Sequence, residues 1–455
     1  MTLPTPMTQP TALASRELAA GRLSPSQLTE HCLTQIAQHN GDLGALTHVD
    51  ADGARAAARV ADARRLAGLP RGPLDGLPVA LKANMAVRGW PLTAGLRFRA
   101  TEIAKEDAAL TARLRSAGAV LIGLSNMDEG ALGAEGLNPW YGSTQNPLRR
   151  GWSAGGSSSG AAAAVAAGLV PLALGSDTIG SLRIPASFCG VASIKPSYGL
   201  LSVRGIVPVH LRFDHVGPMA LRVSDLKLAL DALAFHDPQC RVSIPLQLTA
   251  ARPAHSRVQL AYAVGLDGYQ ISGEVVIAYH RGLAALRAAG HQLVPIDLSR
   301  WDLPRLRRAV LALCELEMWR THRQHMTESP DDFSDGLRAF IRYGGKLDAS
   351  DIGAAEIRIA TFGTDWNQAM APFDACVLPT TACASYPQRE RHPQNTADLS
   401  AIASAGGLPA LSLPLPVPPG EMPVGLQLVG PMASDRELLR IAAEIETRLS
   451  PLAPR

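Results

Sequence analysis

Aromatic residues and unbalanced charge are both scarce in this chain. Phe, Trp and Tyr together make up 5% of its 455 residues, and the formal net charge is only +3. No dense block of Lys and Arg occurs, so the sequence offers neither the basic groove nor the stacking surface that nucleic-acid binding uses. We therefore expect no direct nucleic-acid partner.

Cysteine and long apolar runs are scarce as well. The six cysteines form no CxxC pair and stand at no zinc-ligand spacing with histidine, so we expect packed, reduced thiols and no metal. No apolar run approaches the roughly 20 residues of a membrane span. The first residues, MTLPTPMTQPTALASRE, lack the basic segment and apolar run of a secretory signal. These absences favour a cytoplasmic protein with no membrane partner.

The N-terminal part has the pattern of amphipathic helices. In SPSQLTEHCLTQIAQHN, Ser24 stands at an N-cap position, Pro25 at the first helical position, and Gln27 closes a capping box. Apolar residues then recur at four-residue steps on one face. The segment DADGARAAARVADARRLAG predicts a second helix that ends at Gly68.

Further along the chain, strand and helix patterns alternate. Buried strands are predicted at 77–82 and 119–126, and the segment 257–298 is typical of a strand, a helix and a strand. A helix-rich segment follows over 303–370, and a loop with no periodicity over 384–396. With 47% hydrophobic residues and no low-complexity linker, one large α/β domain is the simplest interpretation.

The segment AGGSSSGAAAAVAAG, residues 154–168, is consistent with three different structures. Its glycines match the start of a phosphate-binding loop, but Ala161 and Ala162 stand where a lysine and a hydroxyl are needed. GSSSG also matches the nucleophile elbow of α/β-hydrolases, with Ser158 at its centre, although the preceding NPLRRGWSAG is typical of a loop and not of the required strand. The third alternative is a flexible turn that caps an alanine-rich helix. A second Gly-Ser turn in LGSDTIGSLRIPASFCG favours a catalytic role.

These two turns together resemble the signature of the amidase signature family. The resembling run is GGSSSGAAAAVAAGLVPLALGSDTIGSLRIPASFCGVASIKPSYG. GPLDGLPVALKAN is similar to the lysine segment of the family, NMDEGALGAEGLNPWYGSTQNP to its middle block, and DHVGPMA and MPVGLQLVGP to later markers. The resemblance extends from about residue 70 to about residue 430.

The resemblance implies an α/β/α sandwich with a mixed central β-sheet flanked by helices. It implies one domain over 1–455, with an N-terminal helical region at 1–69 and a signature core that holds the catalytic residues at 70–235. The remaining sheet, helices and pocket-shaping loops would then occupy 236–455.

The resemblance also implies a set of site residues. Matched by motif, Lys82 is the base, Ser157 the proton bridge and Ser181 the nucleophile, and the Gly156–Ser157 peptide bond is cis. The oxyanion hole implied by the family is built from the backbone amides of Thr178, Ile179, Gly180 and Ser181.

The chemistry of these residues is physically consistent. A serine hydroxyl is a weak nucleophile until a base takes its proton, and a lysine is a base only when neutral. The lysine pKa must therefore fall from about 10.4 to about 7, through burial and local positive potential. The nearly charge-free run around GGSSSG and the N-terminus of the alanine-rich helix suit that requirement. We expect Lys82 beside this turn, and Asp177 and Arg183 as residues that hold the second turn by hydrogen bonds.

Three positions depart from the family pattern. Ala83 stands where aspartate is common, and Ser159 where glycine is common. Ile179 stands where the family has glycine in the motif DTxGS, which places a branched side chain in the pocket wall. The first two departures remove no catalytic group, whereas the third bears on the choice of substrate.

The activity that the resemblance implies is hydrolysis of a linear, non-peptide carboxamide through an acyl-serine intermediate, with release of ammonia or an amine. It implies a small amide substrate and no metal or organic cofactor. One alternative is a protein like the A subunit of an amidotransferase, which releases ammonia from glutamine within a larger complex. Another, a non-catalytic binding protein, is disfavoured because all three catalytic positions are retained. The acyl group, the leaving amine and the oligomeric state stay open, a homodimer among the options.

Overall fold

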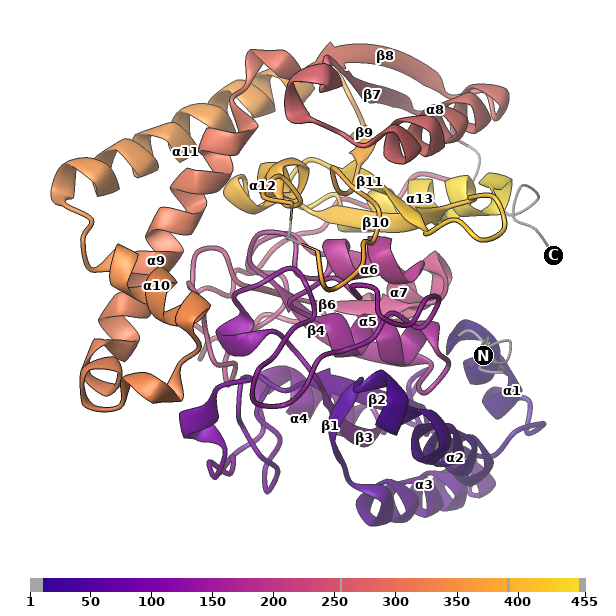
Figure 1. Ribbon diagram of the computed structural model, residues 1–455. Helices are drawn as coiled ribbons and strands as arrows, with labels where there is room; N and C mark the ends of the chain where they lie inside the picture. The colour runs from indigo at the N-terminus through magenta and orange to yellow at the C-terminus, as the bar shows by residue number, and fades with distance from the viewer. Residues whose placement is uncertain (1–10, 254–255, 391–392, 450–455) are drawn as a thin grey trace.

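The computed structural model describes residues 11–253, 256–390 and 393–449. Its strands form one mixed sheet of 11 described strands, in the order β1-β3-β2-β4-β6-β5-β10-β11-β9-β7-β8 (Figure 1). This confirms the predicted α/β class with a mixed central sheet. The strands are β1 (Leu46–Val49), β2 (Pro78–Lys82), β3 (Val120–Ser125), β4 (Leu172–Asp177), β5 (Ala192–Lys195), β6 (His215–Ala220), β7 (Gln259–Val264), β8 (Gln292–Asp297), β9 (Ala375–Pro379), β10 (Ala410–Leu415) and β11 (Val424–Val429).

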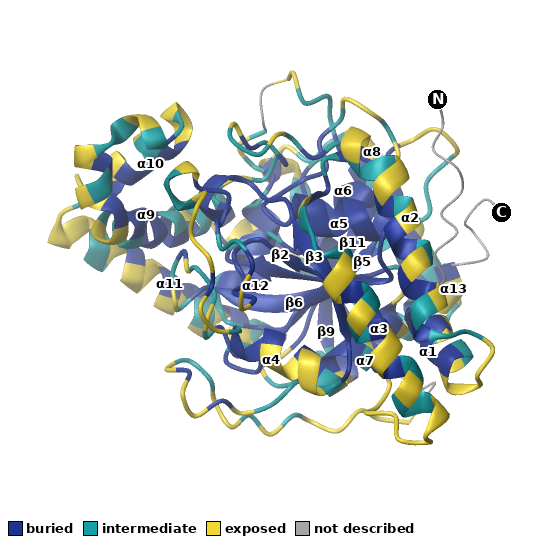
Figure 2. Ribbon diagram, turned by 90° about the horizontal axis from the view of Figure 1, so that it is seen from below, coloured by how far each residue is buried: buried dark blue, intermediate teal, exposed yellow. Residues whose placement is uncertain are grey.

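Helices cover both faces of this sheet. Figure 2 shows α5 and α6 on one side of the strands and α4 and α7 on the other, and α9, α10 and α11 form an arm beside the sheet (Figure 1). The helices are α1 (Thr11–Ala19), α2 (Pro25–Leu43), α3 (Ala51–Leu66), α4 (Ala109–Ser116), α5 (Ser159–Ala166), α6 (Arg183–Cys189), α7 (Val223–Leu233), α8 (Gly273–Ala288), α9 (Leu303–Glu328), α10 (Asp335–Gly344), α11 (Ala349–Met370), α12 (Asp398–Ala405) and α13 (Asp435–Leu449).

The local signals in the sequence locate many of these elements. The Ser24 hydroxyl accepts a hydrogen bond from the Gln27 amide at 3.1 Å, and the Gln27 side chain accepts one from the Ser24 amide at 2.9 Å. The predicted capping box at the start of α2 is therefore confirmed. The strands predicted at 77–82 and 119–126 are β2 and β3, and the helix-rich segment 303–370 contains α9, α10 and α11.

The pairing of the strands determines where the candidate catalytic groups meet. β2 pairs in parallel with both β3 and β4. Because parallel strands end at the same edge of a sheet, Lys82 at the end of β2 and Asp177 at the end of β4 lie at one edge. β4 also pairs with β6 in antiparallel register, with Asp177 opposite His215. This edge carries the site.

The alanine-rich segment forms α5, a helix in which every residue is buried. Its small side chains allow the backbone of neighbouring segments to approach closely. A Cβ atom at Gly160 would collide with the Ala45 carbonyl oxygen and with the backbone of Asn126, so only glycine fits there. The alanines and Gly160 therefore allow α5 to pack at the centre of the core.

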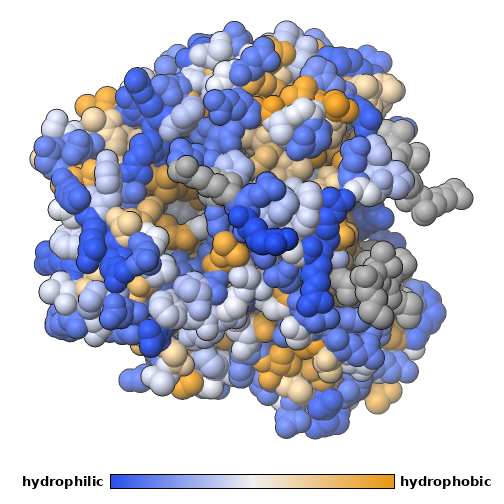
Figure 3. Space-filling view, in the orientation of Figure 1, coloured by the Kyte–Doolittle hydropathy of each residue, from blue (hydrophilic) through white to orange (hydrophobic). Residues whose placement is uncertain are grey.

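The outer surface contrasts with this core. The face in Figure 3 is largely hydrophilic, and its apolar side chains form small patches between charged ones. Among the described residues, no helix is long and apolar enough to span a membrane.

Candidate active site

Lys82 lies at the end of β2 with no exposed surface. Its Nζ atom is 2.8 Å from Ser157 Oγ and 2.9 Å from Ser176 Oγ. Asn84 donates to the same Ser176 hydroxyl at 3.2 Å. The structure therefore brings together two of the three residues to which the family motif assigns catalysis. It adds Ser176 and Asn84, which sequence reasoning did not identify.

The electrostatic surroundings of Lys82 differ from the charge-free environment expected from the sequence. Burial lowers the pKa of Lys82 to about 7, whereas the carboxylates of Asp128, Asp177 and Asp214 each act to raise it. The run around GGSSSG carries few charges, but these carboxylates reach it from other segments of the chain. Desolvation outweighs their combined attraction, so the lysine can be neutral near pH 7.

Asp128 lies directly against the glycine-serine turn. A Cβ atom at Gly156 would come within 2.5 Å of an Asp128 carboxylate oxygen, which accounts for glycine at this position. The carboxylate accepts hydrogen bonds from the amides of Glu135 and Gly136, at 3.0 and 2.9 Å. Burial raises the pKa of Asp128 to about 7, although these hydrogen bonds and the Lys82 charge act to lower it. The Gly156–Ser157 peptide bond beside it is cis, as the resemblance implies.

A buried ion pair holds the second turn. The Asp177 carboxylate accepts from the amides of Gly180 at 2.6 Å and Leu182 at 3.1 Å, and Arg183 donates to both of its oxygens at 3.0 Å. Arg183 also donates to the Ser400 carbonyl of α12 at 2.9 Å. The guanidinium charge and these hydrogen bonds hold the pKa of Asp177 below its ordinary value despite burial. Asp177 and Arg183 have the scaffold role that we expected.

The same ion pair engages one of the four amides that the resemblance assigns to the oxyanion hole. The Gly180 amide is used by Asp177, because a fully buried carboxylate needs hydrogen-bond donors. The amides of Ile179 and Ser181 have no acceptor among the described residues. Ser400 Oγ donates to the Ile179 carbonyl at 2.5 Å and so helps fix the direction of this turn. The amide of Thr178 likewise has no acceptor among the described residues, and the role of these three amides as oxyanion donors stays a prediction.

Ser181 and Ile179 line a cavity of about 160 Å³. Ser181 is partly exposed. Ile179 is in the pocket wall, where its side chain was expected. The wall is largely apolar and comes from six segments, namely the loop after β3, the Asp177 turn, the start of α6, the loop before β6, α9 and the loop before α12. The lining residues are Ala131, Leu132, Gly133, Ala134, Thr178, Ile179, Ser181, Ile184, Val209, Arg307, Leu311, Cys314, Gln394 and Ala397.

Comparison with known proteins assigns this arrangement to a family. A model of the amidase family matches residues 27–439. The chain belongs to the amidase family. It is accordingly a hydrolase of carbon–nitrogen bonds in amides.

Curated relatives of this amidase include the A subunit of glutamyl-tRNA(Gln) amidotransferase from Anaeromyxobacter sp. (strain K). It is 34% identical, with 98% of each chain covered. The protein of the same name from Chloroflexus aurantiacus is 34% identical, with 94% of each chain covered. Similar solved structures include one described as an amidase, with a TM-score of 0.86, 31% identity and coverage of 97% of this chain and 100% of that chain. The peptide amidase of Stenotrophomonas maltophilia has a TM-score of 0.86 and 28% identity, with 100% and 99% covered.

Ser158, the centre of the alternative nucleophile elbow, has a structural role in this amidase. It is fully buried, donates to the Ser176 carbonyl at 2.9 Å and accepts from the Ser176 amide at 3.2 Å. No strand is formed by residues 149–157, which precede it. The GSSSG sequence therefore lacks the strand-turn-helix context of an elbow.

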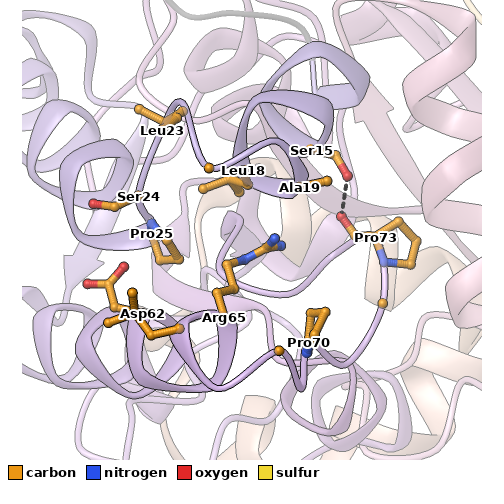
Figure 4. A pocket seen from close by; sticks show the side chains of 14 residues that line it. Ser15, Leu18, Ala19, Leu23, Ser24, Pro25, Asp62, Arg65, Pro70 and Pro73 are labelled. Atoms are coloured by element: carbon orange, nitrogen blue, oxygen red, sulfur yellow. Dashed lines mark hydrogen bonds between the residues drawn. The ribbon is translucent and has the colours of Figure 1, made fainter.

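A larger cavity, of about 890 Å³, lies away from these residues in the amidase (Figure 4). It is formed by α1, the start of α2, the end of α3 and the loop that follows α3. Ser15 on its wall donates to the Pro73 carbonyl at 2.8 Å. Lys82, Ser157 and Ser181 are absent from its lining. Of these three residues, Ser181 lines the smaller cavity.

The loop 384–396 reaches the Ser181 cavity through Gln394. From its composition, the basic run RERH, residues 389–392, is expected to be a solvated part of this loop. Arg389 belongs to the described residues and Arg391 and His392 lie outside them, so that expectation stays a prediction.

Proposed function

We propose that this amidase cleaves a carboxamide through an acyl-Ser181 intermediate, with Lys82 as base and Ser157 as the proton bridge. The observation that carries the proposal is the 2.8 Å contact between Lys82 Nζ and Ser157 Oγ at a site where burial lowers the Lys82 pKa to about 7. A neutral lysine in that position accepts the Ser157 proton. Ser157 in turn accepts the proton of Ser181 as Ser181 attacks.

The proposed steps balance in protons and electrons. The oxygen of Ser181 forms a bond to the carbonyl carbon, its proton passes to Ser157, and the Ser157 proton passes to Lys82. The negative charge that forms on the carbonyl oxygen is stabilised by backbone amides of the second turn, those of Thr178, Ile179 and Ser181. Lys82 returns the proton through Ser157 to the amide nitrogen, and the carbon–nitrogen bond breaks. Water then attacks the ester carbonyl, and one of its protons passes through Ser157 and Lys82 to the Ser181 oxygen as the carbon–oxygen bond of the ester breaks. The other proton leaves as the released acid ionises to the carboxylate, and Ser181 is regenerated.

The buried carboxylates have a part in this cycle. During the first step Lys82 becomes a buried cation, a state that costs free energy unless it is paired. Asp128, Asp177 and Asp214 provide negative charge around it at that moment. They therefore stabilise the protonated lysine that forms in the transition state. Desolvation, in contrast, favours the neutral lysine before the step.

A second candidate is favoured by the relatives. Amidotransferase A subunits are 34% identical to this chain over nearly its whole length. A protein of that type would release ammonia from glutamine by the same chemistry and would need a partner for useful turnover.

One experiment tests the site and separates the two candidates. The purified chain is treated with a fluorophosphonate and assayed with a panel of small amides, ureas and glutamine. We expect labelling at Ser181 by peptide mapping, none in Ser181→Ala, and hydrolysis of a small amide by the chain alone. Labelling at Ser158 would contradict the assignment. Labelling at Ser181 with no turnover of any amide would favour the protein that needs a partner.

A further inference from the structure

The wall of the Ser181 cavity contains one charged side chain among the described residues, Arg307. It belongs to the face of α9 that also presents Leu311 and Cys314 to the cavity, at positions four and seven residues further on. The other lining residues are neutral, and most are apolar. A single guanidinium in such a wall dominates the electrostatics of whatever occupies the cavity.

The protein uses one of the five N–H donors of the Arg307 guanidinium. Its Nε atom donates to Asp398 Oδ1 of α12 at 2.5 Å, and the Asp398 side chain is 3% exposed. Neither Nη atom donates to any described residue, and the Arg307 side chain is 20% exposed. The edge formed by the two Nη atoms therefore remains for a ligand. That edge presents two parallel N–H donors, which match the two oxygens of a carboxylate.

The charges around Arg307 agree with this assignment. Asp398 is its direct partner, and the Arg307 charge counteracts the burial that raises the Asp398 pKa. A guanidinium can bind one carboxylate along each edge, so Asp398 orients Arg307 without occupying its outer edge. Two further buried carboxylates lie against residues of the cavity wall: Asp214 accepts from Thr178 and from two backbone amides, and Asp128 lies against Gly133.

The cavity volume limits the size of the ligand. About 160 Å³ corresponds to roughly five water-sized volumes of about 30 Å³ each. An acyl group with about five non-hydrogen atoms beyond the scissile carbonyl fills it. Two methylene groups and a carboxylate amount to that number.

We propose that the cavity selects short amides whose acyl chain ends in a carboxylate, and that Arg307 is the residue that binds this carboxylate. The proposal rests on the proposed function, because it places the scissile carbonyl at Ser181. Succinamate is the amide of this class that fits the volume. Its uncharged isostere, 4-methylpentanamide, has the same number of non-hydrogen atoms.

The test compares kcat/KM for succinamate, succinamide and 4-methylpentanamide in wild type, Arg307→Met and Arg308→Met. Arg308 is the matched control, because its guanidinium pairs with Glu315 and lies over Tyr343 away from the cavity. We expect wild type and Arg308→Met to prefer succinamate. We expect Arg307→Met to lose about 10- to 100-fold on succinamate, as for a charged hydrogen bond, and to stay within a few-fold on 4-methylpentanamide.

Each other result overturns the proposal. An equal loss on both amides in Arg307→Met would make Arg307 a residue that only supports α12. A wild-type preference for 4-methylpentanamide would exclude carboxylate selection, and an Arg307-dependent preference for succinamide would indicate a neutral acceptor instead.

A second measurement does not depend on turnover. Succinamate should protect Ser181 from the fluorophosphonate in wild type and should not do so in Arg307→Met. Protection without hydrolysis would count against the proposed function and for the Arg307 assignment. Absence of protection by succinamate in wild type would refute the Arg307 assignment alone.

Discussion

Lowering the pH from 8 to 5 should suppress acylation of Ser181, because one group, Lys82, becomes protonated. With its pKa at about 7, Lys82 is about half neutral at pH 7 and about 1% neutral at pH 5. At its ordinary pKa of 10.5 only about one lysine in 3,000 would be neutral at pH 7. Burial thus raises the population of the free base about 10³-fold. The rate of Ser181 acylation should fall about tenfold per pH unit below 7.

The assay must identify the group as well as the pKa, because other buried groups titrate in the same range. Burial lowers the pKa of Lys195 to about 7 as well, and Asp128 titrates near 7. Lys195 Nζ donates to the Pro196 carbonyl at 3.0 Å, and no bond joins it to Ser157. We therefore measure the rate of fluorophosphonate labelling from pH 5 to 9 in wild type, Lys82→Met and Lys195→Met.

The expected outcome is specific to Lys82. Lys82→Met should label about 10²- to 10⁴-fold more slowly and lose the rise near pH 7, since a general base is gone. Lys195→Met should keep that rise. If Lys82→Met keeps the rise and Lys195→Met loses it, the base is not Lys82 and the proposed mechanism is wrong.

Two further predictions concern the pocket and the stability. Ile179→Gly should admit bulkier acyl groups and lower kcat on the best small amide. A few carbons in a pocket change the discrimination between substrates by about 1–3 kcal/mol. An unchanged ranking of kcat/KM over amides of increasing acyl size would show that Ile179 does not limit the size of the acyl group. The pKa of Lys82 is about 7 in the folded chain and near 10.5 when unfolded, so the unfolded chain binds more protons between these values and the wild type gains stability as the pH rises. Its free energy of unfolding relative to Lys82→Met should increase by about 1.4 kcal/mol per pH unit from 7 to 10 in urea titrations, and a constant difference would contradict the assigned pKa.

The sequence was sufficient to predict the fold class, the strands β2 and β3, and the proximity of Lys82 to Ser157. These features were predictable because each of them depends on local signals or on a long family motif. β10 and β11 were not predicted. Pro414 in β10 argues against a central strand, and it is accommodated because β5 pairs only with residues 410–412, so Pro414 lies beyond the end of β5. No local pattern reveals that register.

The groups that tune the site were harder to predict. Ser176 reaches Lys82 because β2 and β4 are paired, and Asp128 reaches Gly156 through a loop, so neither contact follows from spacing along the chain. Ser400 and Asp398 belong to α12, which carries no recognisable motif. The division of the chain at residues 69 and 235 stays a prediction, and so do the roles of Lys82, Ser157 and Ser181.

The position of β10 in the middle of the sheet has a consequence for biosynthesis. β5 ends at Lys195, and its antiparallel partner begins at Ala410, so roughly 200 residues separate the two strands in the chain. At a synthesis rate of about 5–20 residues per second, the ribosome needs about 10–40 s to make that stretch. During this interval the edge of β5 is unpaired, and such edges invite association with other nascent strands. The nascent chain therefore passes through a stage in which shielding by a chaperone would favour correct assembly.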